Sequence, residues 1–600
     1  MTPDLSISTL LKAYREGRRT PEKTILEVWA RAAEDDPSIW INRPSLQHLQ
    51  HYLRALEGES PDTKPLYGIP FAIKDNIDCV GLPTTAACPA WSYEAQESAY
   101  VVNLLIEAGA IPMGKTNLDQ FATGLVGVRS PYGVPQNAFD ARYIPGGSSS
   151  GSAVAVAKGL CSFALGTDTA GSGRVPASFN NLVGLKPTRG VLSCSGVVPA
   201  CRTLDCVSIF ALTAADAALV YNLTASFDEA DAYARKRCML REPAWPPRIG
   251  VPPMDQLDFF GNESAKRLFE SAVKTVADMG WQIVETDISP FLNAARLLYE
   301  GPWVAERAAV ISDLIAENPE SILPVTRNII KGGLKGTAIE AFKAQYRLAE
   351  LKRISEATWN QADVLLMPTT GTIYTLAEVE DEPIQLNSNL GRYTNFMNLL
   401  DLCGCAVPAG FLDTGLPWGV TFYAPACGDA LVLGCAGHFH SAVKLPLGKT
   451  TTPSSSAALP VIPAAEKKVP MMQIAVCGAH MEGLALHWQL SERSARLVQR
   501  THSAPLYQLY LLPGSGRIPD RPGMVRVSEG GSAIEMEVWE IPQSTVGSFL
   551  EGIGAPLGLG KVQLADGSQV CGFVCEGIVA DSAQDITSHG SWRQWLKATQ

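Results

Sequence analysis

Two serines set among glycines are the residues of this sequence that best suit covalent catalysis. Ser148 lies in the run Gly146 to Gly151, which is too small and flexible to build a core, and Ser172 lies in the turn Asp168 to Gly173. In such a tight turn, backbone N–H groups can converge on a point just outside the Ser172 hydroxyl. A nucleophile with amides directed at its target has the geometry that acyl transfer needs, so this stretch predicts an acyl-transfer site.

A serine nucleophile needs a base, and the histidines are poorly placed to supply one. None of the eight histidines lies between His51 and His438, which argues against a Ser-His-Asp triad unless a distant histidine folds back. Lys74 ends an apolar, strand-like run that starts at Pro70, and burial there would lower its pKa and let it act as a neutral base. Lys115 is a competing lysine that lacks this apolar strand context.

These motifs, in their order and spacing, resemble the amidase signature family. The resemblance is carried by Gly68 to Asp75, by Gly146 to Ser149 and by Asp168 to Pro176. It covers essentially the whole chain, with looser motifs in the second half, and implies an amidohydrolase that acts on linear amides. It implies no metal and no organic cofactor.

The same resemblance assigns roles within a Ser-Ser-Lys triad. Ser172 would be the nucleophile, Ser148 the proton relay and Lys74 the base. The family holds the relay serine by a cis peptide, and the sequence leaves open whether that bond precedes or follows Ser148. The oxyanion would be stabilised by backbone amides of Thr169, Ala170, Gly171 and Ser172.

Two further stretches bear on the substrate. In the family, the glycine-rich loop 119–133 lines the active site, and we assign Gly124 to the substrate amide, with a plain connecting loop as the alternative. Tyr299 and Arg307 flank a glycine-proline break. An arginine binds a carboxylate through two parallel hydrogen bonds, to which a tyrosine hydroxyl can add a third. This pair resembles the allophanate hydrolase branch, whose substrate carries a carboxylate; an exposed helix start with a core tyrosine is the alternative.

The composition bounds the partners of the chain. A formal charge of −11 argues against nucleic acid or an anionic membrane as partner. No apolar run approaches the length of a membrane span, and the polar N-terminus has no charged-then-apolar leader. We therefore expect a cytoplasmic enzyme with a small-molecule substrate, and we expect it to be a homodimer.

The length of 600 residues predicts two or more domains. Strand-like runs alternate with helical stretches up to residue 445, which predicts an α/β fold with a mixed β-sheet covered by helices on both faces. Residues 446–470 are rich in proline, serine, threonine and charge, as is typical of an exposed linker. Residues 471–600 show period-two alternation between turns, so we expect a smaller, β-rich α+β domain there.

Three motifs of the C-terminal domain, at residues 476–480, 521–526 and 537–540, resemble those of the allophanate hydrolases. This resemblance implies a fold similar to the γ-glutamyl cyclotransferase group. His480 follows a short apolar strand within a glycine frame. An imidazole titrates near neutral pH, which suits a general acid–base. A histidine hydrogen-bonded into a turn is the alternative.

Taken together, the resemblance implies hydrolysis of allophanate to ammonia and CO2 in ATP-dependent urea degradation. The C-terminal domain would decarboxylate the N-carboxycarbamate formed first. An amidase of other specificity remains the alternative, with the C-terminal domain serving to dock a urea carboxylase.

Overall fold

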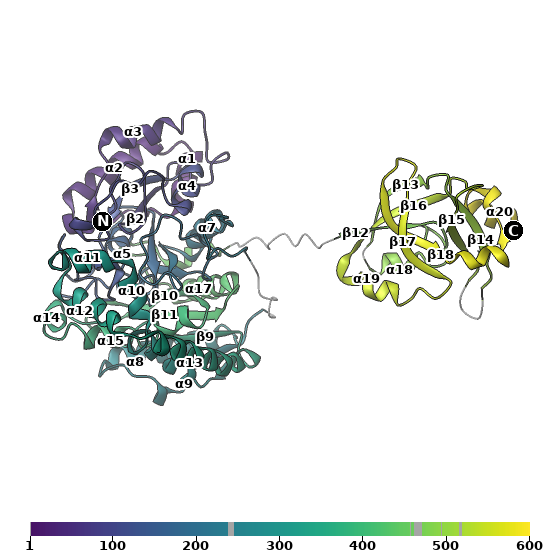
Figure 1. The fold of residues 1–600 in the computed structure, drawn as a ribbon. Coiled ribbons are helices and arrows are strands. Elements are labelled where there is room, and N and C mark those ends of the chain that lie inside the picture. The colour runs from purple at the N-terminus through teal and green to yellow at the C-terminus, as the bar shows by residue number, and fades with distance from the viewer. Residues whose placement is uncertain are drawn as a thin grey trace. The chain divides into compact units, whose positions relative to one another are not determined.

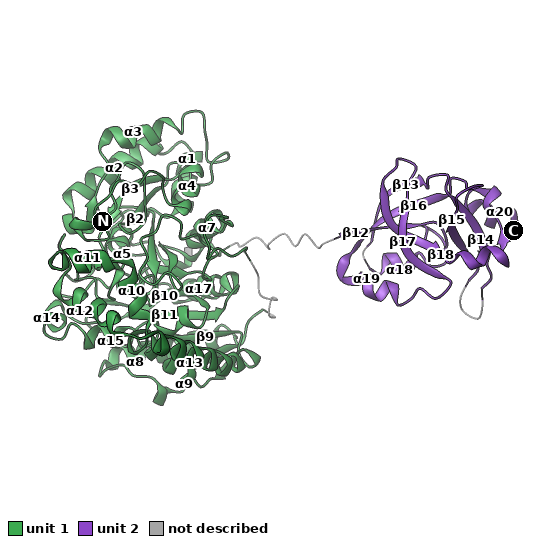
Figure 2. Cartoon of the chain, viewed as in Figure 1, with its two compact units in different colours: residues 1–465 green, residues 466–600 purple. Residues whose placement is uncertain are grey.

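A computed structural model of the chain describes residues 2–237, 245–456, 458–460, 471–493, 495–514 and 519–599. The chain divides into two compact units, residues 1–465 and residues 466–600 (Figure 2). Among the described residues, no helix is long and apolar enough to cross a membrane.

A large mixed sheet forms the centre of the first unit. Within the described residues it has eleven strands. Strand β2 is parallel to β3 and β4, the strands from β4 to β9 pair antiparallel, and β9, β7 and β8 are parallel again. From one edge to the other the order is β1 (Trp40–Asn42), β3 (Ile111–Thr116), β2 (Pro70–Lys74), β4 (Phe163–Asp168), β6 (Cys206–Ala211), β5 (Val183–Lys186), β10 (Leu402–Phe411), β11 (Pro417–Pro425), β9 (Val364–Pro368), β7 (Ile249–Val251) and β8 (Ile283–Glu285).

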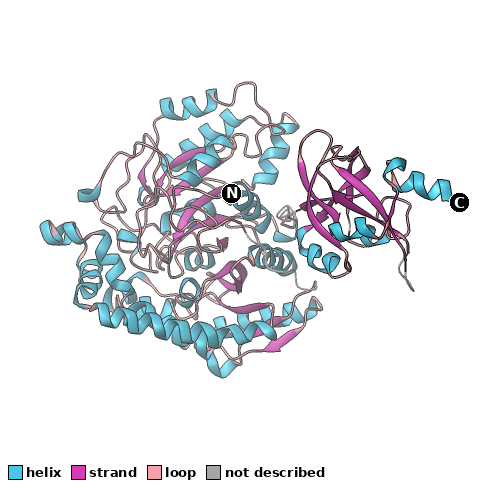
Figure 3. Cartoon of the chain, turned by 45° about the vertical axis from the view of Figure 1, so that its right-hand side comes forward, coloured by secondary structure: helices cyan, strands magenta, loops and turns pink. Residues whose placement is uncertain are grey.

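Helices cover both faces of this sheet (Figures 1 and 3), which confirms the predicted fold class. Strands buried on both faces read as continuous apolar runs, and every residue of β2, β3 and β4 is buried. The α-helices of this unit are α1 (Ile7–Arg15), α2 (Pro21–Glu34), α3 (Leu46–Arg54), α4 (Tyr100–Glu107), α5 (Ser150–Ala157), α6 (Val175–Phe179), α7 (Ala214–Thr224), α8 (Glu263–Asp278), α9 (Ser289–Glu300), α10 (Trp303–Val310), α11 (Ser312–Glu317), α12 (Pro324–Gly332), α13 (Ala338–Glu356), α14 (Leu376–Asp381), α15 (Gln385–Leu390), α16 (Phe396–Leu399) and α17 (Asp429–Val443).

The start of the expected linker packs against the first unit. Leu447 and Ser454 are buried, Pro446 and Pro453 form a β-bridge, and the Ser454 hydroxyl donates to the carbonyl of His440. Residues 447, 448, 450 and 454 are therefore buried within a stretch whose composition suggests exposure, whereas residues 449, 451, 453 and 455 are exposed. Residues 457 and 461–470 of the expected linker lie outside the described residues, and the limits of the linker stay a prediction.

The second unit is smaller and β-rich, as expected. Its described strands form a five-stranded and a three-stranded sheet around a core that includes Ile474, Val538 and Phe573. The first sheet has the order β13 (Arg496–His502), β16 (Glu535–Pro542), β12 (Met471–Val476), β18 (Gln569–Cys575), β17 (Leu557–Gln563); the second has the order β15 (Arg521–Arg526), β14 (Tyr507–Leu512), β19 (Gln584–Asp585); the helices are α18 (Trp488–Ser491), α19 (Gln543–Leu550) and α20 (Trp592–Thr599). The likeness to the γ-glutamyl cyclotransferase group stays a prediction.

Candidate active site

Lys74 and Ser148 meet in the interior of the first unit. Lys74 is the last residue of β2 and is fully buried. Its Nζ lies 2.7 Å from Ser148 Oγ and 2.8 Å from Oγ1 of Thr167, which belongs to the neighbouring strand β4. The structure thus places an amine between two hydroxyl groups, with no carboxylate hydrogen-bonded to it among the described residues.

The electrostatics of Lys74 suit a proton acceptor. Burial lowers the pKa of Lys74 to about 7, since an ammonium ion loses its hydration in the interior. The charges of Asp119, Asp168 and Asp205 raise this pKa, and the charge of Arg307 lowers it. Near neutral pH a substantial part of the lysine is therefore the neutral amine, which can take up a proton.

The backbone around Ser148 is fixed by close packing. The peptide bond between Gly147 and Ser148 is cis, one of the two positions that the sequence left open. The Ser148 carbonyl accepts a hydrogen bond from the amide of Asp119 at 3.0 Å. A Cβ at Gly147 would lie 2.1 Å from Asp119 Oδ2, so only glycine fits there.

Ser172 lies in a buried turn between β4 and α6. The carboxylate of Asp168 closes this turn: it accepts from the amides of Gly171 at 2.8 Å and Gly173 at 3.0 Å. The Arg174 guanidinium donates to both oxygens of the same carboxylate, at 2.8 and 3.0 Å. Burial acts to raise the pKa of Asp168, but Arg174 holds it below its usual range. The carboxylate is therefore ionised, and it orders the backbone on both sides of Ser172.

The turn leaves some amides free. The Gly171 amide is engaged by Asp168, whereas the amides of Thr169, Ala170 and Ser172 have no acceptor within the described part of the chain. Gly171 has a φ of +133°, and a Cβ there would lie 2.4 Å from Thr394 Oγ1. This glycine is therefore required by the shape of the turn.

Residues distant in the sequence also form hydrogen bonds with the Ser172 turn. The side-chain amide of Asn398 donates to the Asp168 carbonyl at 2.7 Å and to the Leu204 carbonyl at 2.8 Å. The Arg174 guanidinium donates in addition to the carbonyl of Thr394 at 3.2 Å. Residues beside and within α16 thus complete the surroundings of Ser172.

Lys115 occupies a buried strand as well, so the expectation that it lacks such a context is wrong. All residues of β3 are buried, because β3 lies inside the sheet between β1 and β2. The Lys115 ammonium forms an ion pair with Asp75 Oδ1 at 3.2 Å and donates to Thr84 Oγ1 at 2.8 Å. The carboxylate partner, and not the strand context, separates Lys115 from Lys74.

Arg307 and Gly124 meet at the glycine-rich loop. Arg307 lies in α10 with 4% of its surface exposed, so it is not part of an exposed helix start. Its Nη1 donates to the Ala122 carbonyl at 3.2 Å and to Thr123 Oγ1 at 3.1 Å, directly before Gly124. Gly124 has a φ of +157°, and a Cβ there would lie 2.6 Å from Asp119 Oδ2. The loop therefore leaves no room for a side chain at this position.

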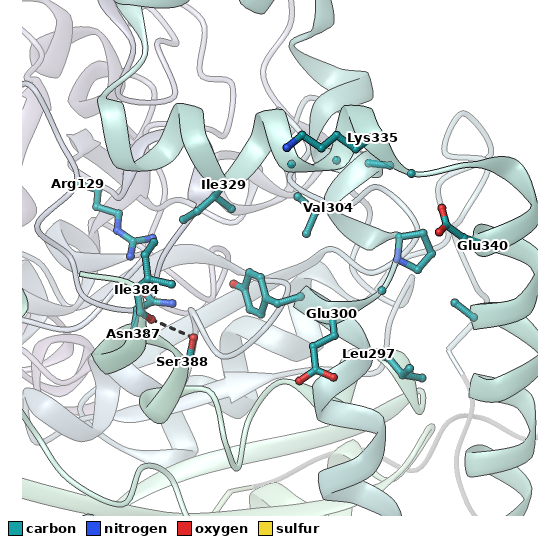
Figure 4. Close-up of a pocket in the computed structure, with 18 residues that line it drawn as sticks. Arg129, Leu297, Glu300, Val304, Ile329, Lys335, Glu340, Ile384, Asn387 and Ser388 are labelled. Atoms are coloured by element: carbon teal, nitrogen blue, oxygen red, sulfur yellow. Dashed lines mark hydrogen bonds between the residues drawn. The ribbon is translucent and has the colours of Figure 1, made fainter. Parts of the chain in front are cut away.

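Tyr299 lines a cavity of about 650 Å³ beside this loop. Arg129 lies on the wall opposite Glu340, with Lys335 at a third side (Figure 4). Ser172, Ser148 and Lys74 are not among the lining residues. The lining consists of Arg129, Leu297, Tyr299, Glu300, Gly301, Pro302, Val304, Ala305, Ile329, Gly332, Gly333, Lys335, Gly336, Glu340, Ala344, Ile384, Asn387 and Ser388.

The sequence prediction missed several polar residues of this region. Thr167, Asp119 and Arg129 are buried and contact Lys74, Gly124 or their loop. Asp119 and Arg129 lie in the glycine-rich loop that was singled out, so their charge in an apolar setting was an available signal. Thr167 gave no such signal in the sequence, because it lies 93 residues from Lys74, the residue that it contacts.

His480 lies in the second unit, where its ring is enclosed by aromatic side chains. Its Nε2 is 2.9 Å from Gln489 Oε1, and its ring stacks on Phe573 with the centroids 4.9 Å apart. Burial lowers the pKa of His480, while the hydrogen bond to Gln489 opposes this shift. His480 lines a small cavity together with Arg521.

The fold and these motifs define a class of protein: the chain belongs to the amidase family. The family model described as "Amidase" matches residues 24–433, and the model described as "Allophanate hydrolase C-terminal domain" matches residues 472–597. Both matches confirm the resemblance that the sequence motifs indicated.

Within that class, the chain is similar to an allophanate hydrolase and to two urea amidolyases. A solved structure of Kluyveromyces lactis allophanate hydrolase has 39% identity, covers 99% of both chains and gives a TM-score of 0.72. The urea amidolyase of Saccharomyces cerevisiae is 43% identical over 578 residues, which are 93% of this chain and 31% of that protein. The urea amidolyase of Lachancea kluyveri is 40% identical over 612 residues, which are 99% of this chain and 32% of that protein. The chain thus spans about a third of the length of these urea amidolyases.

Proposed function

We propose that the chain is an amidohydrolase that converts allophanate to ammonia and CO2 in urea degradation. The observation that carries the chemistry is the hydrogen bond from the buried Lys74, whose pKa is lowered to about 7, to Ser148. The substrate rests on the likeness to Kluyveromyces lactis allophanate hydrolase over nearly the whole of both chains.

The reaction uses one path for the proton. Ser172 Oγ attacks the carbonyl of the terminal amide, its proton passes to Ser148, and the Ser148 proton passes to neutral Lys74. The C–N bond then breaks, and the nitrogen keeps the electron pair, takes the proton back through Ser148 and leaves as ammonia. Water follows the same path to cleave the acyl-enzyme, which restores Ser172 and releases N-carboxycarbamate.

The oxyanion would be stabilised by backbone amides of the Ser172 turn. The free amides of Thr169, Ala170 and Ser172 are the candidates. Gly171 was part of the sequence assignment, but its amide already donates to Asp168. We therefore limit the assignment to three amides and give Gly171 a conformational role.

Arg307 and Tyr299 would hold the carboxylate of the substrate, with Gly124 contacting its amide. Support comes from the burial of Arg307 against the loop residue before Gly124. Loss of a guanidinium contact to a carboxylate costs about 2–5 kcal/mol. The Arg307→Ala variant should lose activity on allophanate and discriminate less against biuret, a neutral amide. An equal loss on both substrates would make Arg307 structural.

The direct test measures products from the purified chain. Allophanate should yield equal amounts of ammonia and CO2, and biuret should react far more slowly. A chain that prefers neutral amides would be an amidase of other specificity, which is the second candidate.

In the second unit, His480 would move the proton when N-carboxycarbamate loses CO2. The bond from the carboxylate carbon to nitrogen breaks, the electron pair stays on nitrogen, and the imidazole relays a proton to it. Carbamate then decomposes without an enzyme. A chain truncated after Leu459 and the His480→Ala variant should both release the first ammonia but evolve CO2 more slowly. Wild-type CO2 evolution by His480→Ala alone would remove this histidine from the reaction.

The remaining partners are proposals as well. Helix α13 packs on α9, yet it exposes Ile339 (69%), Phe342 (56%) and Tyr346 (65%) along one stripe. An antiparallel second copy of α13 would cover this stripe and bring Lys343 of each copy toward Glu350 of the other. A homodimer is therefore the expected state, and Phe342→Glu should give monomers in light scattering. A urea carboxylase would supply allophanate in the cytoplasm.

A further inference from the structure

Asp205 is a buried carboxylate beside the Ser172 turn that the proposed reaction does not use. It lies directly before β6 and is 6% exposed. Its Oδ1 accepts hydrogen bonds from the Thr169 hydroxyl and, at 3.2 Å, from the amide of Cys201. Its Oδ2 accepts from the amide of Ala200 at 2.8 Å. All three donors are uncharged, and a buried carboxylate that depends on such donors is held firmly in place by them.

The residue that Asp205 contacts is also held from its other side. Asn398 Nδ2 donates to the Asp168 carbonyl at 2.7 Å and to the Leu204 carbonyl at 2.8 Å. These carbonyls belong to the peptide groups that carry the amides of Thr169 and Asp205. In a planar trans peptide group the N–H points away from the C=O, so the bond to the Asp168 carbonyl sets the direction of the Thr169 amide. Thr169 is therefore fixed through its amide plane by Asn398 and through its hydroxyl by Asp205.

The charge of Asp205 also acts on Lys74. Burial raises the pKa of Asp205, while the hydrogen bonds that it accepts and the charge of Arg307 oppose this shift. Burial lowers the pKa of Lys74, and the charges of Asp119, Asp168 and Asp205 oppose that shift, whereas Arg307 adds to it. Loss of the Asp205 charge should therefore lower the pKa of Lys74 further.

We propose that Asp205 is a positioning residue, which holds Thr169 so that the amides of Thr169 and Ala170 face the oxyanion formed when Ser172 attacks. This inference rests on the proposed function. The oxyanion exists only after the attack, so a positioning role predicts a loss in kcat and not in KM. A carboxylate that served stability alone would leave the turnover per folded molecule unchanged.

The first test removes the hydroxyl of Thr169 and keeps the carboxylate. Thr169→Val has nearly the same shape, and it should lower kcat for allophanate about 10–100-fold while KM stays within about threefold. Thr169→Ser keeps the donor and should retain kcat within about threefold. Equal losses of kcat in both variants would mean that the methyl group matters and not the hydrogen bond, which would overturn the inference.

The second test removes the charge of Asp205 and keeps its size. Asp205→Asn should lower kcat and move the acid limb of the kcat/KM profile to lower pH, by less than about one unit, because Lys74 loses a nearby negative charge. A folded Asp205→Asn variant with wild-type kcat and an unmoved acid limb would contradict the proposal. If this variant does not fold, the two Thr169 variants decide the question.

Thr188 and Asp429 supply the matched control. The Thr188 hydroxyl donates to Asp429 Oδ2 at 2.6 Å, and both residues are buried in the same unit. Asp429 is not among the main causes of the lowered pKa of Lys74. Thr188→Val should therefore keep kcat per folded molecule, and Asp429→Asn should keep the acid limb in place.

The outcomes separate this inference from the proposed function. Wild-type kcat in Thr169→Val, or an equal loss in Thr188→Val, would overturn the inference and leave the proposed function intact. A wild-type chain that turns over neither allophanate nor biuret would refute the proposed function, and the inference with it.

Discussion

Two buried lysines on neighbouring strands of one sheet meet different partners. Lys74 ends β2 and donates to the hydroxyls of Ser148 and Thr167, whereas Lys115, on β3, pairs with the carboxylate of Asp75. Strands β2 and β3 are parallel neighbours, and Lys115 pairs with Ile73, the residue before Lys74. Both side chains are fully buried. Burial alone therefore does not distinguish the two lysines. Within the described part of the chain, only Lys115 of the two forms an ion pair with a carboxylate, and we propose that this difference leaves Lys74 able to accept a proton.

The largest expected effect is a loss of kcat when Lys74 or either of the two serines is replaced. Ser172→Ala and Lys74→Met should each lower kcat by about 10⁴–10⁶-fold, and Ser148→Ala somewhat less, because water can replace a relay. Lys115→Met should leave kcat within about threefold per folded molecule. Combined Ser148 and Lys74 substitutions should not multiply their losses, since both act on one proton path. Multiplied losses in steady-state kinetics would place Lys74 outside that path.

The next largest effect is a lower free energy of unfolding when Lys115 is replaced. Lys115→Met leaves the buried carboxylate of Asp75 without its cation and should cost about 3–5 kcal/mol of unfolding free energy. Lys74→Met leaves only two hydroxyls short of a donor and should cost about 1–2 kcal/mol. Denaturant unfolding measures both. The double substitution Lys115→Met with Asp75→Asn should recover part of this loss of unfolding free energy. Equal losses for Lys115→Met and Lys74→Met would contradict the view that the carboxylate partner separates the two lysines.

The pH dependence follows from the lowered pKa of Lys74. The amine must be neutral to accept a proton, and its pKa is about 7. Below pH 7, log kcat/KM should therefore rise by about one per pH unit, and above pH 7 it should level off. A plateau that extends down to pH 5 would mean that another group is the base.

The smallest expected effect concerns the charges that set the pKa of Lys74. The Arg307 charge lowers the pKa of Lys74, so Arg307→Ala should raise that pKa and move the acid limb of the activity profile to higher pH, by less than about one unit. Arg327→Ala on α12 is the control, because Arg327 pairs with Glu320 and is not among the main causes of the lowered pKa of Lys74. A shift in the opposite direction would show that loop rearrangement outweighs the charge.

The sequence predicted what local patterns encode. The apolar run before Lys74 and the glycine-serine stretches gave the strand, the two serines and the class of reaction. Thr20, directly before Pro21, caps α2 by accepting a hydrogen bond from the amide of Lys23. Such features depend on neighbours within a few residues, which is why the chain order reveals them.

The partners across strands and loops were not predictable in the same way. The Asp75 that neutralises Lys115 stands next to Lys74 in the sequence, where it suggests no link to residue 115. The contacts of Arg129 with Pro383 span 254 residues. The burial of Leu447, Thr450 and Ser454 was also missed, because a composition typical of linkers does not exclude specific hydrogen bonds.

One consequence of the Ser172 turn concerns the order of synthesis. The Asp168 carbonyl is held by Asn398, 230 residues later, and Arg174 is held by the carbonyl of Thr394. The ribosome adds Ser172, the proposed nucleophile, long before it adds these residues. A growing chain that ends before Asn398 carries Ser172 in an incomplete turn and lacks β10, the central neighbour of β5. The surroundings of Ser172 are therefore complete only after most of the first unit has been made.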